Sequence, residues 1–315
     1  MAQLVAVPFQ AALVEKRLGM VAMCVAMALL PIGDAISKSL TAYATAFEVT
    51  VWRTLAQAMF FVPVALSLHR RLSGSIFSLP ALISAGLILT VTLSLVSAFA
   101  AMPIATAIAI FFVEPLLLTL LAGPFLGEAP GLRRYTAVGV GLVGALIVIR
   151  PNFTEYGPVV LLPLLGALAY ALNMIVMRRA TRTRSPLSFQ FGASLMGAGL
   201  VLLAYFGAEL GGVRLTDLGA LPVWAALSVL GAGALAMAAF LLITFAFSKV
   251  EASLLAPFQY LEIVGATLVG YLIFSEIPDS MTLIGTAIIL GSGAYVFHRE
   301  RARNVDAAAT QRLER

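Results

Sequence analysis

The chain has 315 residues, of which 61% are hydrophobic and only 11% are charged. A soluble domain carries about 25% charged residues, so this composition excludes a soluble globular protein and makes lipid the expected solvent. The net charge of +5 would suit an acidic partner such as nucleic acid. The basic residues stand in short loops between apolar segments, however, where they act as topology signals. Cys24 is the only cysteine, which excludes an internal disulfide and a cysteine–histidine metal cluster.

The apolar segments have the length of membrane-spanning helices. A helix needs about 20 residues to cross the hydrocarbon core, and charged, glycine, proline or turn residues divide the chain into ten such segments. The division is least marked near residue 101, where Pro103 favours a break because proline cannot continue a helix normally. In chain order we expect spans at residues 19–39, 48–68, 79–99, 103–124, 134–150, 157–177, 188–209, 222–246, 253–274 and 279–297.

The basic residues predict the orientation of these spans. With the N-terminus in the cytoplasm, 16 of the 20 lysines and arginines fall in cytoplasmic segments, and only Arg150 and Arg214 fall outside. Lys38 and Arg53 lie in or near the membrane itself. Because cytoplasmic loops carry an excess of Lys and Arg, we expect a multi-pass protein of the cell inner (cytoplasmic) membrane with both termini in the cytoplasm.

Five spans in each half make the two halves enter the membrane from opposite sides, as inverted-topology repeats do. The predicted fold is therefore all-α and integral to the membrane, with ten transmembrane helices in two five-helix inverted-topology repeats. The repeats cover residues 18–150 and 157–298, and residues 299–315 form a cytoplasmic tail. An acidic pattern recurs at an offset of 148 residues: Glu114, Glu128 and Pro130 match Glu262, Glu276 and Pro278.

Three ionisable residues stand early in the chain, within apolar runs. Asp34 and Lys38 are four residues apart and so share a helix face. They form either an ion pair that binds a polar or zwitterionic solute, or a structural pair from which Lys38 extends toward water. Arg53, with Gln57 one turn later, offers a planar fork for carboxylate or carbonyl oxygens. The alternative for Arg53 is a salt bridge to Asp34 or Glu48 that joins the first two spans.

Glu114 and Glu262 lie in the middle of the fourth and ninth spans. Burial disfavours the charged form of a carboxylate, so each could exchange protons and couple them to transport. The alternative is a protonated side chain that hydrogen-bonds a neighbouring helix. Pro115 and Pro257 stand close to the two carboxylates and are expected to loosen each helix and free carbonyl groups there.

Aromatic and amide side chains accompany these carboxylates. Tyr170 and Asn173 are three residues apart, and Gln259 and Glu262 repeat this spacing, with Tyr260 beside them. Such a lining suits a flat or amphipathic solute, whereas the alternative is that these side chains face lipid or a helix interface. The sequence has no phosphate-binding glycine loop, so ATP hydrolysis by this chain is not expected.

Five short motifs in or next to the expected spans belong together. They are Asp34-Ala35-Ile36-Ser37-Lys38, Trp52-Arg53, Phe125-Leu126-Gly127-Glu128, Tyr170-Ala171-Leu172-Asn173 with Arg178-Arg179, and Ala256-Pro257-Phe258-Gln259-Tyr260 through Phe274-Ser275-Glu276. With these motifs, residues 18–298 resemble the EamA-type branch of the drug/metabolite transporter (DMT) superfamily. This resemblance implies two EamA domains in the cytoplasmic membrane and transport of small metabolites. Members export amino acids and metallophores or import riboflavin or S-adenosylmethionine, and the start of this chain looks most like the uptake members.

These observations predict a secondary transporter that moves a small organic metabolite across the membrane, and not an enzyme. Uptake of a vitamin such as riboflavin is the leading expectation, and export of amino acids or related metabolites and drugs is the alternative. A membrane scaffold or enzyme is disfavoured, because the sequence offers no catalytic or metal-ligand set while it buries several charges. The expected partners are the solute, the bilayer and, as a candidate coupling ion, the proton. No cofactor or nucleic-acid partner is expected, and the oligomeric state is open.

Overall fold

The computed structural model describes residues 2–126, 132–213, 215–216, 219, 221–250, 255 and 258–295. Within this part the chain is helical, with no strand, as the sequence predicts. Glu128, Pro130, Arg214, Pro257 and the predicted tail 299–315 lie outside the described residues.

The first half contains α1 (Ala2–Leu40), α2 (Ala46–Ser67), the 3₁₀ turn η1 (His69–Arg71), α3 (Leu79–Ala101), α4 (Ile104–Phe111), α5 (Glu114–Leu126) and α6 (Leu132–Tyr156). The second half contains the 3₁₀ turn η2 (Gly157–Leu161), α7 (Leu162–Ala180), α8 (Pro186–Leu210), α9 (Val223–Lys249), α11 (Leu261–Phe274) and a last helix, Ser280–Tyr295.

Local signals explain where several of these helices start and stop. Thr45 and Glu48 form a capping box at the start of α2, in which the side chain of each bonds the backbone N–H of the other. Ser185 caps α8 through the backbone N–H of Ser188. Gly157 has φ of +70°, a conformation that glycine adopts without strain, and it separates α6 from α7.

Seven helices within the described residues are long and apolar enough to cross a membrane, which makes the chain a multi-pass membrane protein. One of the seven is the run Tyr135–Ala180, which includes η2 and therefore both α6 and α7. The helices Leu261–Phe274 and Ser280–Tyr295 are apolar but shorter. The predicted count of ten spans stays a prediction.

The expected span 103–124 agrees with the candidate span Ile104–Leu121, but the helix is interrupted within it. α4 ends at Phe111 and α5 begins at Glu114. At the break, the N–H of Val113 bonds the carbonyl of Ile110 at 3.2 Å in a tight turn. Pro115 explains the position of the break, because a proline is tolerated in the first turn of a helix and interrupts a longer one.

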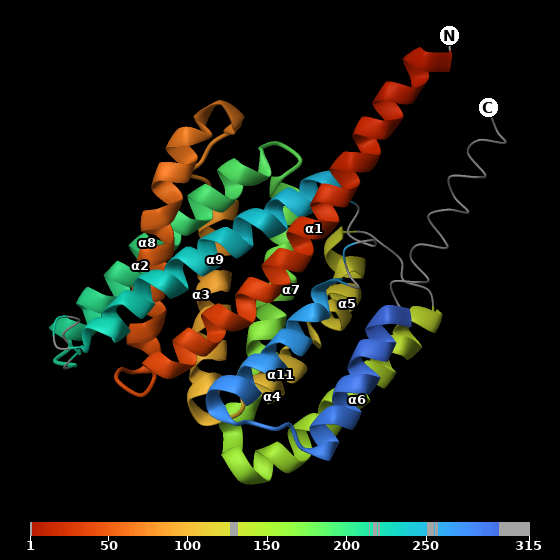
Figure 1. The fold of residues 1–315 in the computed structure, drawn as a ribbon. Helices are drawn as coiled ribbons and strands as arrows, with labels where there is room; N and C mark the ends of the chain where they lie inside the picture. The colour runs from red at the N-terminus through yellow and green to blue at the C-terminus, as the bar shows by residue number, and fades with distance from the viewer. Residues whose placement is uncertain are drawn as a thin grey trace.

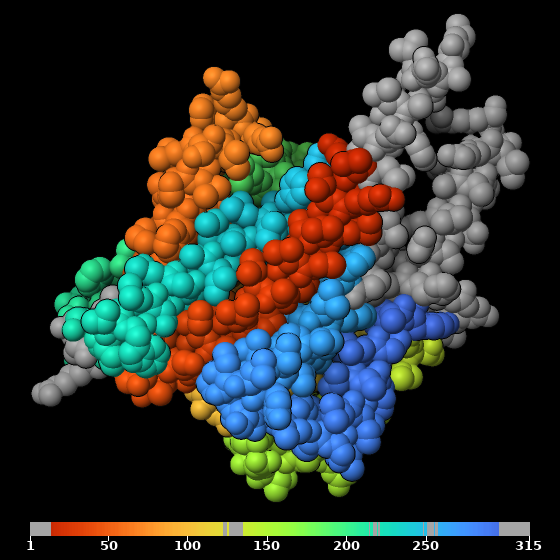
Figure 2. All heavy atoms as spheres, in the orientation of Figure 1, coloured from red at the N-terminus to blue at the C-terminus, as the bar shows by residue number. Residues whose placement is uncertain are grey.

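The helices form one bundle in which both halves of the chain interleave (Figure 1). α1 packs along α9 and α11, and it crosses the visible face of the molecule between them in Figure 2. α3 packs along α7 and α8, while α2 packs on α8 and α9. Because each of these contacts joins the first half to the second, the two halves do not pack as separate layers.

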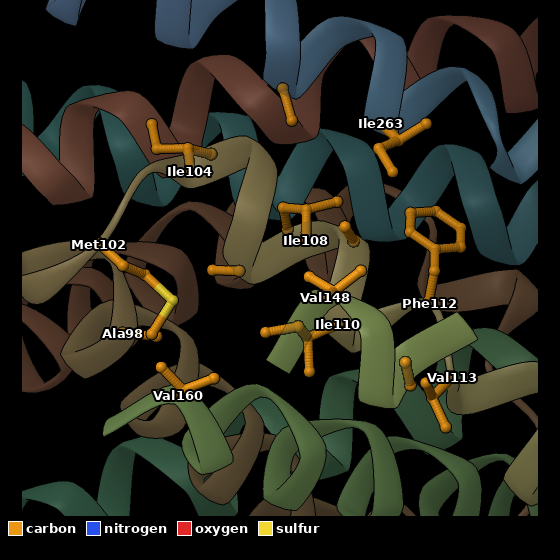
Figure 3. Close-up of a cluster of buried hydrophobic side chains, with 14 of the residues drawn as sticks. Ala98, Met102, Ile104, Ile108, Ile110, Phe112, Val113, Val148, Val160 and Ile263 are labelled. Atoms are coloured by element: carbon orange, nitrogen blue, oxygen red, sulfur yellow. The ribbon is translucent and has the colours of Figure 1, made fainter. Parts of the chain in front are cut away.

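The short helix α4 lies at the centre of the largest apolar cluster. Every residue from Ile104 to Ile110 is at most 4% exposed, so α4 is covered on all sides. Figure 3 shows Ile104 and Ile108 of α4 among Val148 of α6 and Ile263 of α11. Burial of these side chains fixes the chain just before the break and so helps to position Glu114, the first residue of α5.

Close packing of α6 against the last helix yields a first prediction. A Cβ atom on Gly144 would lie 2.9 Å from the carbonyl oxygen of Gly285 and 2.9 Å from Cγ2 of Ile288, whereas one on Gly139 would meet no atom within 4 Å. We expect Gly144→Ala to destabilise the protein by about 1–3 kcal/mol through overpacking. Gly139→Ala should be neutral or stabilising. Thermal unfolding of the purified variants checks this, and equal melting temperatures would contradict it.

Candidate functional site

A cavity of about 1260 Å³, its mouth included, lies between helices of both halves. Hydrophobic side chains from α1, α3, α8 and α9 form much of its wall, together with the aromatic rings of Phe111, Phe112 and Phe240. Its polar lining consists of Asp34, Arg53, Thr54, Gln57, Thr92, Glu114, Tyr170, Gln190, Ser194, Gln259 and Glu262. A largely apolar pocket with a few convergent polar groups is the usual form of a small-molecule site.

The cavity brings together six of the nine side chains that the sequence suggests for a solute site. These six are Asp34, Arg53, Glu114, Tyr170, Gln259 and Glu262, and the other three, Lys38, Asn173 and Tyr260, are not part of the lining. Glu114 and Glu262 are separated by 148 positions in the chain, so only the packing of the two halves can place them in one cavity.

Asp34 and Arg53 form an ion pair in the lining of the cavity. Nη1 of Arg53 lies 3.2 Å from Oδ1 of Asp34 and donates a second bond, 3.1 Å long, to the Ser37 hydroxyl. The pair joins α1 to α2, as one of the two interpretations of Arg53 expects. Glu48, the other candidate partner, instead accepts bonds from the backbone of Thr45 and Thr216. Within the described residues, Nη2 and Nε of Arg53 have no protein partner and remain able to bind a solute anion.

Lys38 does not pair with Asp34, so the expected ion pair within one helix is wrong. Its Nζ instead donates to the carboxylate of Glu276 and to the carbonyl of Met102 at 2.8 Å, and it lies 5.2 Å from the centre of the Phe274 ring. The i,i+4 spacing places Asp34 and Lys38 on one face of α1, but each binds a partner outside α1: Asp34 binds Arg53 of α2, and Lys38 binds Met102 and Glu276, which lie between helices.

Glu114 and Glu262 are the two lining carboxylates without a protein partner. Within the described part of the chain, neither makes an ion pair or a side-chain hydrogen bond. Glu114 is 7% exposed and is the first residue of α5, and Glu262 is the second residue of α11. A helix N-terminus is a favourable place for a negative charge because its free N–H groups carry partial positive charge. Each carboxylate is therefore stabilised by a helix end and remains available to a ligand.

The aromatic and amide residues divide between the cavity and the protein interior. Tyr170 packs against Phe111 with ring centroids 5.8 Å apart, and both side chains line the cavity. Tyr260 packs against Phe112 at 5.7 Å and lies outside the lining. Asn173 is 6% exposed and accepts a 2.6 Å bond from the Ser84 hydroxyl. We interpret Asn173 as a structural link between α7 and α3.

Sequence reasoning missed four polar lining residues: Thr54 on α2, Thr92 on α3, and Gln190 and Ser194 on α8. Gln57, which the sequence places one turn after Arg53, also lines the cavity from α2. Spacing could have indicated Gln190 and Ser194, because they are four residues apart in an apolar helix, as Arg53 and Gln57 are.

The fold and the cavity define a multi-pass membrane protein with a candidate site for a small molecule. Comparison with known proteins identifies the family. The profile of the EamA-like transporter family matches residues 17–150 and 157–297, so the chain belongs to this family. The resemblance seen in the sequence is thereby confirmed, as is the expectation of a transporter-family protein and not an enzyme.

Curated relatives are similar over part of their length. The chain is 30% identical over 201 residues to an S-adenosylmethionine uptake transporter of Rickettsia felis, and the match covers 63% of this chain and 65% of that protein. It is 31% identical over 209 residues to a riboflavin transporter of Rhizobium johnstonii, covering 66% of each. The match thus spans just under two thirds of either relative.

A solved crystal structure has the same fold. It aligns with a TM-score of 0.61 at 21% identity and covers 90% of this chain and 96% of its own.

Proposed function

We propose that this protein is a secondary transporter that takes up a small organic metabolite across the cell inner membrane through the cavity described above. The observation that carries the proposal is the pair Glu114 and Glu262. Both are carboxylates without a protein partner among the described residues, and both line the same cavity from the start of a helix. Ionisable groups inside a membrane bundle are costly unless they serve an ion or a solute.

We further propose ten spans in two inverted repeats, in which α1, α2, α3, α5 and α6 correspond to α7, α8, α9, α11 and the last helix. The packing pairs support this correspondence because they exchange into one another. The contact of α1 with α9 corresponds to that of α7 with α3, and the contact of α1 with α11 to that of α7 with α5. The contact of α2 with α8 corresponds to itself. A two-fold axis in the membrane plane would produce this pattern.

This topology predicts the side on which each terminus and linker lies. Reporter fusions after residue 152 should read outside the cytoplasm, and fusions after residue 315 should read inside it, since the charge bias is 16 to 2. Both fusions on the same side would contradict five spans per half.

The polar groups of the cavity suit a solute that carries both signs of charge and a flat ring. Among the described residues, Arg53 keeps N–H groups without a partner that could bind an anion, and the carboxylates of Glu114 and Glu262 have no partner and suit a cation. Phe111 and Tyr170 offer aromatic surface. S-adenosylmethionine, the solute of one relative, has a carboxylate, an ammonium, a sulfonium and a planar base. We therefore propose it as the first candidate.

Riboflavin, the expectation from the sequence and the solute of another relative, is the second candidate. Its flat ring suits the aromatic wall, but it carries no cation for Glu114 and Glu262. Export of amino acids is the third, since Arg53 and the carboxylates could hold an amino-acid zwitterion.

Transport requires that the cavity open to each side of the membrane in turn, and we propose that the Lys38–Glu276 pair closes one end. Lys38 belongs to the first family segment and Glu276 to the second. The Glu276 carboxylate also accepts a 3.1 Å bond from the N–H of Ile104, the first residue of α4. These contacts join α1 to the α3–α4 junction and to the segment after α11. On α1 they are made by Lys38, which lies four residues beyond Asp34.

Breaking this pair should open that end of the cavity. In a Cys24→Ala background, we expect Lys38→Met to increase labelling of Leu95→Cys, a lining position, by a membrane-impermeant thiol reagent added outside the cells. If the ion pair stabilises the closed state by about 1.4 kcal/mol, its loss should make the labelling reaction tenfold faster than in the parent. Lys38→Arg keeps the ion pair and should label like the parent, and an unchanged rate in Lys38→Met would contradict the gate.

Growth rescue tests the proposed function. Cells that cannot make S-adenosylmethionine, and separately cells that cannot make riboflavin, receive the solute in the medium. The wild-type protein should restore growth of one strain, as should Glu209→Gln, a control at an exposed position of α8. The double variant Glu114→Gln/Glu262→Gln should not. Failure to rescue either strain, with amino acids accumulating in the medium, would favour the export alternative.

A further inference from the structure

We infer that Ser194, Gln190 and Gln57 form a subsite that binds the uncharged, hydrogen-bonding edge of a planar heterocycle in the solute. This inference rests on the proposed function and adds which part of the cavity binds which part of the solute. The charged part would lie toward Arg53, Glu114 and Glu262, and the heterocycle toward Gln57, Gln190 and Ser194.

The Ser194 hydroxyl is the observation that points to a ligand. Ser194 is 8% exposed and lines the cavity, and its Oγ has no hydrogen-bond partner within the described part of the chain. Several helical hydroxyls bond the carbonyl four residues earlier: Ser37, Ser39, Thr50, Thr90, Thr92, Thr119, Ser228 and Thr267. The hydroxyls of Ser84 and Ser292 bond groups on other helices. A buried hydroxyl without a partner costs free energy, and a group bound in the cavity would supply the partner.

Two glutamine side chains line the same cavity from α8 and α2. Gln190 precedes Ser194 by four residues, and so lies one turn earlier on the same face of α8. α2 runs antiparallel to α8, with two contacts that set the register, the Phe61–Phe191 ring pair at 6.1 Å and Thr54 against Gly197. This register places Gln57 at the level of Ser194. Within the described residues, neither glutamine side chain makes a hydrogen bond.

The chemistry of these three side chains defines what they can recognise. Each amide offers two N–H donors and a carbonyl acceptor, and a hydroxyl both donates and accepts. None of the three carries a charge, so they are poor partners for an ammonium or sulfonium group. They can instead pair with the alternating donors and acceptors along the edge of a nitrogen heterocycle, as buried polar groups that specify a ligand do.

The experiment compares ligands that contain or lack the heterocycle. Binding to the purified protein is measured for S-adenosylmethionine, for adenosine, which keeps the base, and for S-methylmethionine, which keeps only the charged amino-acid sulfonium. We expect Ser194→Ala to weaken the first two by about threefold to tenfold, the range for one hydrogen bond, and to leave S-methylmethionine unchanged. Gln57→Met, on the other helix, should show the same selectivity. Ser228→Ala, whose hydroxyl bonds the Trp224 carbonyl on an exposed face, should bind all three ligands like the wild type.

The outcomes separate this inference from the proposed function. If the wild type binds S-adenosylmethionine but Ser194→Ala and Gln57→Met weaken all three ligands equally, or none, the subsite is wrong and the function stands. If the wild type binds riboflavin instead, the same comparison uses riboflavin and ribitol, which lacks the ring. If the wild type binds neither solute, the proposed solutes and the subsite built on them are both overturned.

Discussion

Glu262→Gln is expected to raise the apparent KM for the transported solute by about tenfold to a hundredfold. This range corresponds to the loss of a hydrogen bond to a charged group, about 1.5–3 kcal/mol. Glu262 has Gln259 beside it in the lining and no ion-pair partner within the described residues. Its charge is therefore free to hold a cationic group of the solute. Initial rates over a range of solute concentrations measure the effect.

Glu114→Gln serves as the matched comparison, since it occupies the corresponding position 148 residues earlier. Phe111, Phe112 and Leu117 surround it in sequence, a poor environment for a charge. If Glu114 couples protons, the glutamine should keep the fold and flatten the dependence of transport on pH between about 5.5 and 8, because an amide cannot titrate. Wild-type rates with an unchanged pH profile would reduce Glu114 to a structural residue.

Arg53→Met is expected to destabilise the protein by about 3–5 kcal/mol, because it leaves the Asp34 carboxylate buried without its counter-charge. Asp34 is only 5% exposed and its pair with Arg53 spans 3.2 Å. Removing both charges in Asp34→Asn/Arg53→Gln should recover part of the loss. Thermal unfolding and the yield of monodisperse protein in detergent provide the measurement.

Lys38→Met provides the control for this pair. Sequence spacing alone suggests that it could rescue Asp34→Ala, but Lys38 bonds Glu276 and Met102 instead, so we expect no rescue. A double variant at Asp34 and Arg53 that is less stable than either single variant would show that the two side chains do not act as a pair.

Composition and hydropathy were sufficient to predict the helical membrane fold, whereas the family was indicated by the resemblance of short motifs. Part of the candidate site was predictable, namely the residues whose chemistry is unusual for their place in the sequence. Asp34, Arg53, Glu114 and Glu262 stand out because a charge inside an apolar run needs a partner or a cavity, and the cavity contains all four.

Partner choice was not predictable, because it depends on which helices meet in three dimensions. Lys38 binds Glu276, 238 positions away, and Asn173 binds Ser84, 89 positions away. Helix periodicity shows only which residues share a face of one helix. The same limit hides Ser194, whose type is common in apolar helices and whose role depends on the missing bond to its own helix.

Uptake by purified protein in sealed liposomes tests the central claim, that this cavity carries a small metabolite across the membrane. The account predicts saturable accumulation of labelled S-adenosylmethionine, or failing that of riboflavin, by the wild type and by Glu209→Gln. It predicts loss of that uptake in Glu114→Gln/Glu262→Gln protein that folds normally. Equal uptake by the double variant, or no uptake of either solute by the wild type, would contradict the account.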